Sequence, residues 1–176
     1  EACTLNIAPT TSTTLALAWG DSIAVALMTQ RGTALEAFRA NHPGGSLGKR
    51  LSLRVQSLMT QQAHTPTLGP NESFQTIVQS LNASRLGGVL VVEGALLLGV
   101  ITEGDIRRAL LQGPDCFQKC ANQLMTSHPV LSYPEQLAWE ALQLMENRPH
   151  ALSLLPVVEK DTRRWCGILR LHDLLQ

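Results

Sequence analysis

Apolar residues recur every three or four positions in two stretches of the chain, which is the spacing of one face of an α-helix. They are Phe74, Ile77, Val78 and Leu81, and then Leu137, Ala141, Leu144 and Met145. This pattern predicts helices over Ser73–Ser84 and Glu135–Asn147. The hydroxyl of Ser73 is placed to cap the first helix, and Pro134 stands where the start of a helix tolerates proline.

Short runs of Val, Leu and Ile predict two β-strands after each of these helices. Gly, Asp or Pro bounds the runs, as is typical of strands. The runs cover Val89–Val92, Leu96–Ile101, Leu152–Val158 and Cys166–Leu169. A short helix is expected from about Glu103, and a final helix is expected to end at Gln176.

These elements form an internal repeat. Ser57–Thr60 opens the first copy and Gln123–Thr126 opens the second, with the two methionines 66 residues apart (125 − 59). Each opening leads into a Pro-containing loop, a helix, two strands and a helix. A repeat of about 60 residues is only marginally able to bury a core by itself. We therefore expect the two copies to pack face to face and share a core.

The first 50 residues follow a different plan. A hydroxyl-rich run, Pro9–Thr14, precedes a helical pattern over Leu15–Met28 and looks like a cluster of N-capping residues. A second helix is expected over Ala34–Asn41, ending where Pro and Gly follow in His42–Gly45. These helices have no sheet to cover. The segment is therefore expected to be the end of an α/β domain whose strands lie upstream of Glu1.

Composition narrows the range of partners. The chain has 14 Lys and Arg against 14 Asp and Glu, so it has no excess charge with which to hold a nucleic acid or an anionic membrane. The most apolar stretch, Gly88–Ile101, is interrupted by Glu93 and is shorter than the roughly 20 residues of a membrane-spanning helix. No targeting segment is expected, because the chain starts at Glu1 without an initiator Met or a basic region.

Four scattered cysteines suit a reducing compartment better than a disulfide framework. Cys116 and Cys120 could share a helical face, with His128 following. A zinc site would need a fourth ligand and tighter pairing, so ordinary thiols and no metal are expected.

Two matched motifs resemble the strand-to-helix turn of CBS domains: Gly99–Asp105 and Gly167–Asp173. Three segments near the N-terminus resemble the end of the SIS domain of arabinose 5-phosphate isomerases, which also carry a C-terminal CBS pair. These segments are Glu1–Thr10, Gly20–Asp21 and His42–Gly48, with Thr4 standing where that family would have proline. The resemblance covers the whole chain.

The resemblance implies an α/β (α+β) fold, a tandem CBS pair preceded by the C-terminal helices of a SIS domain. The implied domains are the SIS segment at 1–51, the first CBS domain at 52–114 and the second at 115–176. A polypeptide starting near Ser52 is expected to be at least as soluble as the whole chain.

The same resemblance implies an aldose–ketose isomerase acting on sugar phosphates, in a pathway to the eight-carbon acid sugar of bacterial lipopolysaccharide. Such a reaction moves a proton between adjacent carbons and needs a base and a proton carrier. Glu1 and His42 match the catalytic glutamate and histidine, expected to act across a subunit boundary. The alternative is that Glu1 is a frayed terminus and His42 a helix-end cap. The present residues alone are expected to be inactive.

The CBS pair implies a cleft for a regulatory nucleotide, with adenine or cytidine as the base, or for a nucleotide-sugar. Asp105 and Asp173 are placed to accept hydrogen bonds from a ribose diol. Thr102 and Arg170 occupy equivalent positions and could donate to a phosphate. The alternative for each aspartate is an acid in the first turn of a helix, which needs no ligand. Trp165 could stack on a base, but a packing role is expected.

Three functions stay open on this basis. The chain is part of an isomerase, a CBS sensor of a nucleotide or nucleotide-sugar, or a CBS pair that only holds subunits together without a ligand. A cytoplasmic location and a homo-oligomer are expected, with no cofactor needed for the chemistry.

Overall fold

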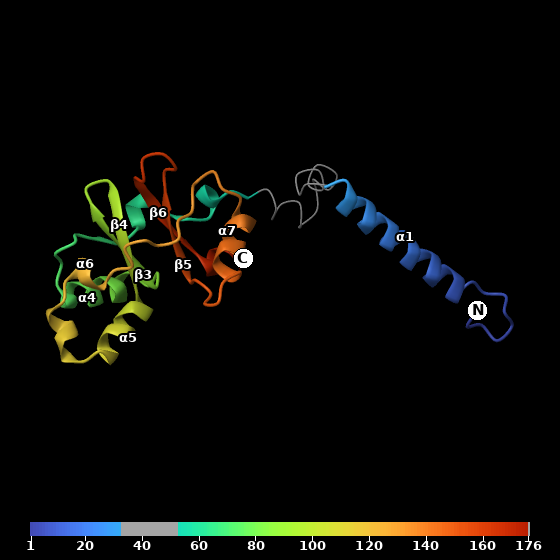
Figure 1. Ribbon diagram of the computed structural model, residues 1–176, viewed down its shortest axis with the longest axis horizontal. Helices are drawn as coiled ribbons and strands as arrows, with labels where there is room; N and C mark the ends of the chain where they lie inside the picture. Colours follow the sequence, from blue (N-terminus) through green and yellow to red (C-terminus); the bar gives the residue numbers. More distant parts are fainter. Residues whose placement is uncertain (33–52, 176) are drawn as a thin grey trace. The chain divides into compact units, whose positions relative to one another are not determined.

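The computed structural model describes residues 1–32 and 53–175, in two compact units, Glu1–Gly48 and Lys49–Gln176 (Figure 1). The expected helix over Ala34–Asn41, the His42–Gly45 turn and the residue at the predicted boundary, Ser52, lie outside the described residues.

One helix, α1 (Thr11–Gln30), dominates the described part of the first unit, as the pattern from Leu15 predicts. The expected hydroxyl cap is absent, because the side chain of the N-cap residue Thr10 makes no capping hydrogen bond. The carboxylate of Glu1 takes that role and accepts the N–H of Ser12 at 3.3 Å. No α1 residue is buried. Its exposed large apolar side chains are Leu15, Leu17, Trp19, Ile23, Val25, Leu27 and Met28.

The second unit contains both repeats. The first runs through 3-10 helix η1 (Val55–Ser57), β1 (Thr60–Gln61), η2 (Gln62–His64), β2 (Thr67–Leu68), α4 (Phe74–Ser84), β3 (Gly88–Glu93), β4 (Leu96–Thr102) and α5 (Glu103–Leu111). The second runs through η3 (Pro114–Gln118), α6 (Ala121–Leu124), α7 (Ala138–Glu146), β5 (Leu154–Val158), β6 (Trp165–Arg170) and α8 (Leu171–Leu175). Helices α4, α5 and α6 gather at one end of this unit and α7 lies at the other (Figure 1).

The opening segment of each repeat pairs with a strand of the other repeat. The two sheets have the strand orders β2-β3-β4 and β1-β6-β5. Strand β1 opens the first repeat but pairs antiparallel with β6 of the second, with Thr60 opposite Ile168. In the reciprocal contact, Thr126 of the second repeat forms an antiparallel bridge with Val100 in β4. This exchange fixes the two repeats to one another through backbone hydrogen bonds.

Both faces of the two hairpins are buried, which explains their continuous apolar runs. In β3, Val89 and Val91 pack against Ile77 and Leu81 of α4, whereas Leu90 faces the opposite side. In β5, Leu155 and Val157 pack toward α7, and Leu154 and Val158 face the other hairpin. The shared cluster, Leu90, Leu97, Val100, Leu154, Val158 and Ile168, is the core expected between the repeats.

Helix α4 matches its prediction, and the hydroxyl of Ser73 accepts the N–H of Thr76 as the expected cap. Helix α7 starts three residues later than the predicted Glu135, at Ala138. The reason is a tertiary contact: Leu137 bridges Arg54, and the N–H of Ala138 donates to the carbonyl of Leu53 at 2.8 Å. Pro134 therefore lies in a loop rather than at the helix start.

Some strand boundaries also differ from the pattern. Strand β5 starts at Leu154 instead of Leu152, and β6 includes Trp165. The loop after Met59 contains the short strands β1 and β2, which are too short to give a periodic signal. Across residues 1–32 and 53–175, no helix has the length and apolar character to cross a membrane.

Candidate functional site

A cavity of about 700 Å³ in the second unit is lined by both repeats. The first repeat contributes the turn from β4 into α5, including Thr102 and Asp105. The second contributes the segment after Thr126, including His128, and the approach to β5, including Leu152. The exchange of opening segments described above brings these parts together.

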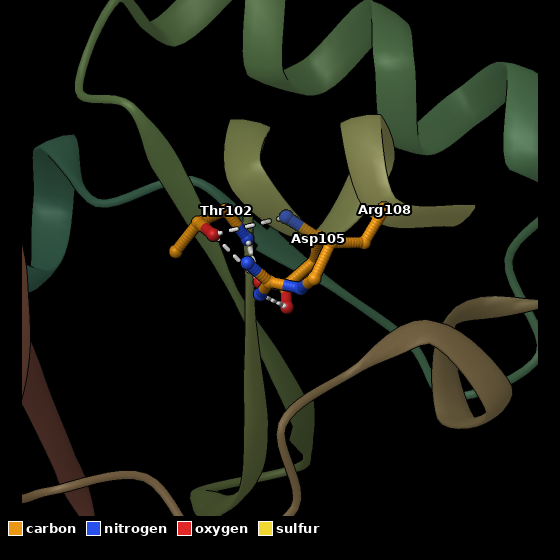
Figure 2. A network of polar contacts seen from close by, with 3 residues as sticks. All are labelled: Thr102, Asp105 and Arg108. Atoms are coloured by element: carbon orange, nitrogen blue, oxygen red, sulfur yellow. Dashed lines mark hydrogen bonds and ion pairs between the residues drawn. The ribbon is translucent and has the colours of Figure 1, made fainter. Parts of the chain in front are cut away.

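Thr102 and Asp105 form a reciprocal capping box at the start of α5 (Figure 2). Asp105 Oδ2 accepts the backbone N–H of Thr102 at 2.8 Å and its hydroxyl at 2.6 Å. The N–H of Asp105 in turn donates to the Thr102 hydroxyl oxygen at 3.3 Å. The alternative of a structural first-turn acid is therefore realised in the geometry, and the hydroxyl proton of Thr102 is already committed to Asp105.

Arg108 holds the other carboxylate oxygen of Asp105. Its Nη2 donates to Oδ1 at 2.5 Å (Figure 2). The side chain of Asp105 is only 10% exposed, whereas that of Arg108 is 68% exposed. The aspartate is thus fixed in the cavity wall, while its cationic partner has free space around it. Oδ1 retains an accepting position for one further donor.

The rest of the wall combines apolar and cationic groups. Val100, Val130, Leu152 and Leu154 supply apolar surface, and Arg107, Arg108, His128 and His150 supply basic side chains. Glu103 and Asp105 are the acidic lining residues. Apolar surface with a few polar groups at its edge suits a flat organic ring that carries an anionic substituent.

The second predicted turn is not part of this cavity. Neither Arg170 nor Asp173 is among the lining residues. Arg170 folds onto Asp173, with Nε donating to Oδ2 at 2.9 Å and Nη2 to Oδ1 at 2.5 Å. The hydrogen bond to Asp173 raises the pKa of Arg170. The structure therefore brings Thr102 and Asp105 together in a cavity, and it pairs Arg170 and Asp173 with each other elsewhere.

Glu1 is held in place rather than frayed. Its Oε2 accepts the N–H of Thr10 at 2.7 Å and the Thr10 hydroxyl at 3.0 Å. Hydrogen bonds from the Ser12 side chain and the Thr10 backbone lower the pKa of the Glu1 carboxyl to about 2. His42, the other predicted catalytic residue, lies outside the described residues.

The remaining candidates have simple structural environments. Trp165 is half-buried against the shared core and donates its indole N–H to the carbonyl of Gly94 at 3.3 Å, which is the expected packing role. Cys116 is buried and Cys120 half-buried. Over the part of the chain that the structure describes, no three His, Cys, Asp or Glu residues cluster as metal ligands would.

The sequence reading missed the contribution of the second repeat to this cavity. His128 and His150 carry no recognisable motif, and the segment around Pro129 lies in a loop. The signal that could have found His128 is the repeat itself, because Thr126, at the opening of the second copy, pairs with Val100 in the strand that leads to the turn of the first copy.

The family model for the CBS domain matches the chain twice, over residues 55–112 and 121–176. The whole chain is 41% identical to arabinose 5-phosphate isomerase KdsD of Pseudomonas aeruginosa, over 177 residues that cover 100% of this chain and 53% of that protein. KdsD of Escherichia coli K12 is 37% identical with the same coverage. The chain thus corresponds to the C-terminal half of these relatives and spans about half their length.

Solved structures show the same fold at low sequence identity. CBSX2 in complex with AMP gives a TM-score of 0.62 at 21% identity, covering 70% of this chain and 94% of that chain. The CBS domain pair of protein MJ0100, in complex with 5′-methylthioadenosine and S-adenosyl-L-methionine, gives 0.61 at 23%, covering 70% and 93%. Since the two family matches span more than half of the sequence, the chain belongs to the CBS domain family.

Proposed function

We propose that the CBS pair is a regulatory sensor that binds a nucleoside phosphate or nucleotide-sugar in the cavity between its repeats. The observation that carries this proposal is the composition of that cavity of about 700 Å³, whose lining combines apolar residues with Asp105 and four basic side chains. Two similar folds have been crystallised with AMP and with adenosine derivatives. An adenine or cytidine nucleotide matches this chemistry.

Different lining residues would hold different parts of the ligand. The apolar residues hold the base, and Asp105 Oδ1 accepts a ribose hydroxyl. Arg107, Arg108, His128 and His150 hold the phosphate, together with the first turn of α5, where the helix dipole favours an anion. In this proposal Thr102, predicted as a phosphate donor, instead positions Asp105, because its hydroxyl donates to that carboxylate.

A thermal-shift panel tests the sensor. The probes are AMP, CMP, the corresponding triphosphates and the cytidine-activated eight-carbon sugar acid. A ligand at 100 times its Kd adds about 2.7 kcal/mol to the native state. We expect a rise of several degrees in Tm. The rise should be lost in Asp105→Ala and kept in the control Asp161→Ala, which changes an exposed acid outside the cavity.

A flat panel from a folded protein would contradict the sensor. It would favour the other CBS role, in which the pair holds subunits together without a ligand. Sedimentation across a range of protein concentrations then distinguishes a ligand-independent homo-oligomer from a monomer.

The second part of the proposal places this sensor in a cytoplasmic aldose–ketose isomerase that interconverts ribulose 5-phosphate and arabinose 5-phosphate for lipopolysaccharide synthesis. The support is 41% identity to KdsD across the whole chain. Residues 1–51 would be the end of the SIS domain, followed by CBS domains at 52–114 and 115–176. Glu1 and His42 would carry the proton transfers in that assembled site.

A chimera tests the isomerase part. The upstream half of the Pseudomonas aeruginosa relative is joined to this chain at the aligned position of Glu1, and conversion of ribulose 5-phosphate is measured. We expect activity in the chimera and a loss of at least about 100-fold in Glu1→Gln and in His42→Ala, the range of a general acid–base contribution. A folded but inactive chimera, or full activity in both variants, would contradict this part.

A further inference from the structure

We infer that the CBS pair binds one nucleotide and not two, because Arg170 closes the strand-to-helix turn of the second repeat by pairing with Asp173. This inference rests on the proposed sensor function and adds its stoichiometry. It also assigns Arg170 as the residue that makes the two repeats unequal.

The two turns occupy equivalent places in the repeats. Strand β4 ends at Thr102 and leads into α5, and strand β6 ends at Arg170 and leads into α8. In both turns an aspartate follows three residues later, Asp105 in one and Asp173 in the other. The difference between them is the residue that ends the strand.

In the first turn the aspartate is available to a ligand. Thr102 contacts only Oδ2 of Asp105, so this pair can hold the carboxylate of a residue that lines the cavity without using Oδ1. Among the described residues, Oδ1 accepts from Arg108, whose side chain is mostly exposed. Arg108 can therefore rotate from the carboxylate to a ligand phosphate. The hydrogen bond between Thr102 and Asp105 is kept when Arg108 moves.

In the second turn both oxygens of the aspartate are taken by one neighbour. Asp173 Oδ2 accepts the Nε–H and the backbone N–H of Arg170, the latter at 3.4 Å, while Oδ1 accepts from Nη2. The side chains of Arg170 and Asp173 are 31% and 13% exposed, so neither is surrounded by water. A planar guanidinium that meets a carboxylate through two parallel hydrogen bonds is a geometrically specific pair.

Arg170 donates to both oxygens of Asp173, whereas Arg108 donates to only one oxygen of Asp105. A ribose diol that replaced the arginine at Asp173 would therefore have to break more hydrogen bonds than one that replaced Arg108 at Asp105. Arg170 is anchored at the end of a strand, and its backbone N–H contacts the same carboxylate. Moving its side chain would leave a largely buried carboxylate facing an anionic ligand. In the first turn, by contrast, the displaced arginine is exposed and the capping hydroxyl of Thr102 remains.

The test is isothermal titration calorimetry on the 176-residue chain, with AMP and CMP titrated separately. The key variant is Arg170→Thr, which gives the second turn the residue that the first repeat has at the equivalent position. We expect one site in the wild type and two sites in Arg170→Thr. In the double variant Asp105→Ala with Arg170→Thr, one site should remain. Unfolding curves establish that each variant is folded. Arg170→Ala is a second test of the same site, because it removes the guanidinium without adding a hydroxyl.

The outcomes separate this inference from the proposed function. Two sites in the wild type would overturn the inference and leave the sensor standing. One site in the wild type that stays one in folded Arg170→Thr and Arg170→Ala would also overturn it. No binding of either nucleotide to the wild type or to the variants would overturn the sensor and the inference together.

Discussion

The hydroxyl of Thr102 and the carboxylate of Asp105 hold each other in place: the hydroxyl donates to Oδ2 at 2.6 Å and accepts the N–H of Asp105 at 3.3 Å. This pair links the two roles of the turn between β4 and α5. It starts the helix, and it fixes the carboxylate that the proposed ligand would meet.

The capping box should contribute measurably to stability without any ligand. Thr102→Ala removes both hydrogen bonds of the hydroxyl and is expected to lower the free energy of unfolding by about 1 kcal/mol. Thr102→Ser, which retains the hydroxyl, should lose much less. Urea unfolding of the ligand-free protein measures both, and equal losses in the two variants would show that the hydroxyl does not act as a cap.

The exchange of opening segments should depend on two glycines. A Cβ at Gly167 would lie 2.1 Å from the carbonyl oxygen of Thr60, and one at Gly99 would lie 2.7 Å from that of Thr126. Because backbone must move in both cases, Gly167→Ala and Gly99→Ala are each expected to cost about 1–3 kcal/mol. Gly69→Ala is the control, since its nearest neighbour would be 4.0 Å away.

Unfolding in urea again gives the comparison for these glycines. If Gly167→Ala and Gly69→Ala unfolded at the same urea concentration, this would contradict the close approach of β1 to β6.

The CBS pair should fold without the first unit. All described buried clusters lie between Val55 and Leu174, whereas α1 buries none of its residues. A polypeptide of residues 49–176 is therefore expected to keep the Tm of the CBS pair in the whole chain. It should also aggregate less, because it lacks the exposed apolar side chains of α1. A clearly lower Tm or greater aggregation would refute the independence of this unit.

Glu1 should titrate well below an ordinary glutamate. Hydrogen bonds from Ser12 and Thr10 lower its pKa from 4.5 to about 2. Because the folded pKa is depressed, these contacts stabilise the folded N-terminal turn above about pH 4.5, and their contribution is lost as the pH falls toward 2. NMR titration of the side-chain carboxyl measures this pKa. Ser12→Ala should raise it, and a midpoint near 4.5 in the unmodified chain would contradict the contacts.

Much of the fold was predictable because its signals are local. The spacing of Phe74, Ile77 and Leu81 gave α4, Ser73 marked its start, and the repeated motifs gave two equivalent halves that share a core. The start of α7 was not predictable, because a backbone pairing between Arg54 and Leu137, far apart in sequence, overrides the local pattern.

The candidate site was predictable only in part for the same reason. Thr102 and Asp105 belong to a recognisable turn, and the structure places them in a cavity. Equivalence between repeats suggested the same role for Arg170 and Asp173, but a sequence motif does not show that one side chain folds onto another. His128 follows Thr126, which pairs with Val100 of the first repeat, and His150 lies in the loop before β5, so both reach the cavity through tertiary packing that no local motif shows.

The most direct test of the central claim is to locate the ligand by ¹H–¹⁵N NMR while AMP, and separately CMP, is added to the ¹⁵N-labelled chain. The account predicts saturable shifts at the amides of residues 102–108, 128–130 and 150–156, with the turn at 170–173 unchanged. No shifts at millimolar nucleotide, or shifts confined to a separate cavity that is lined by Gln61, Trp165 and Cys166, would contradict it.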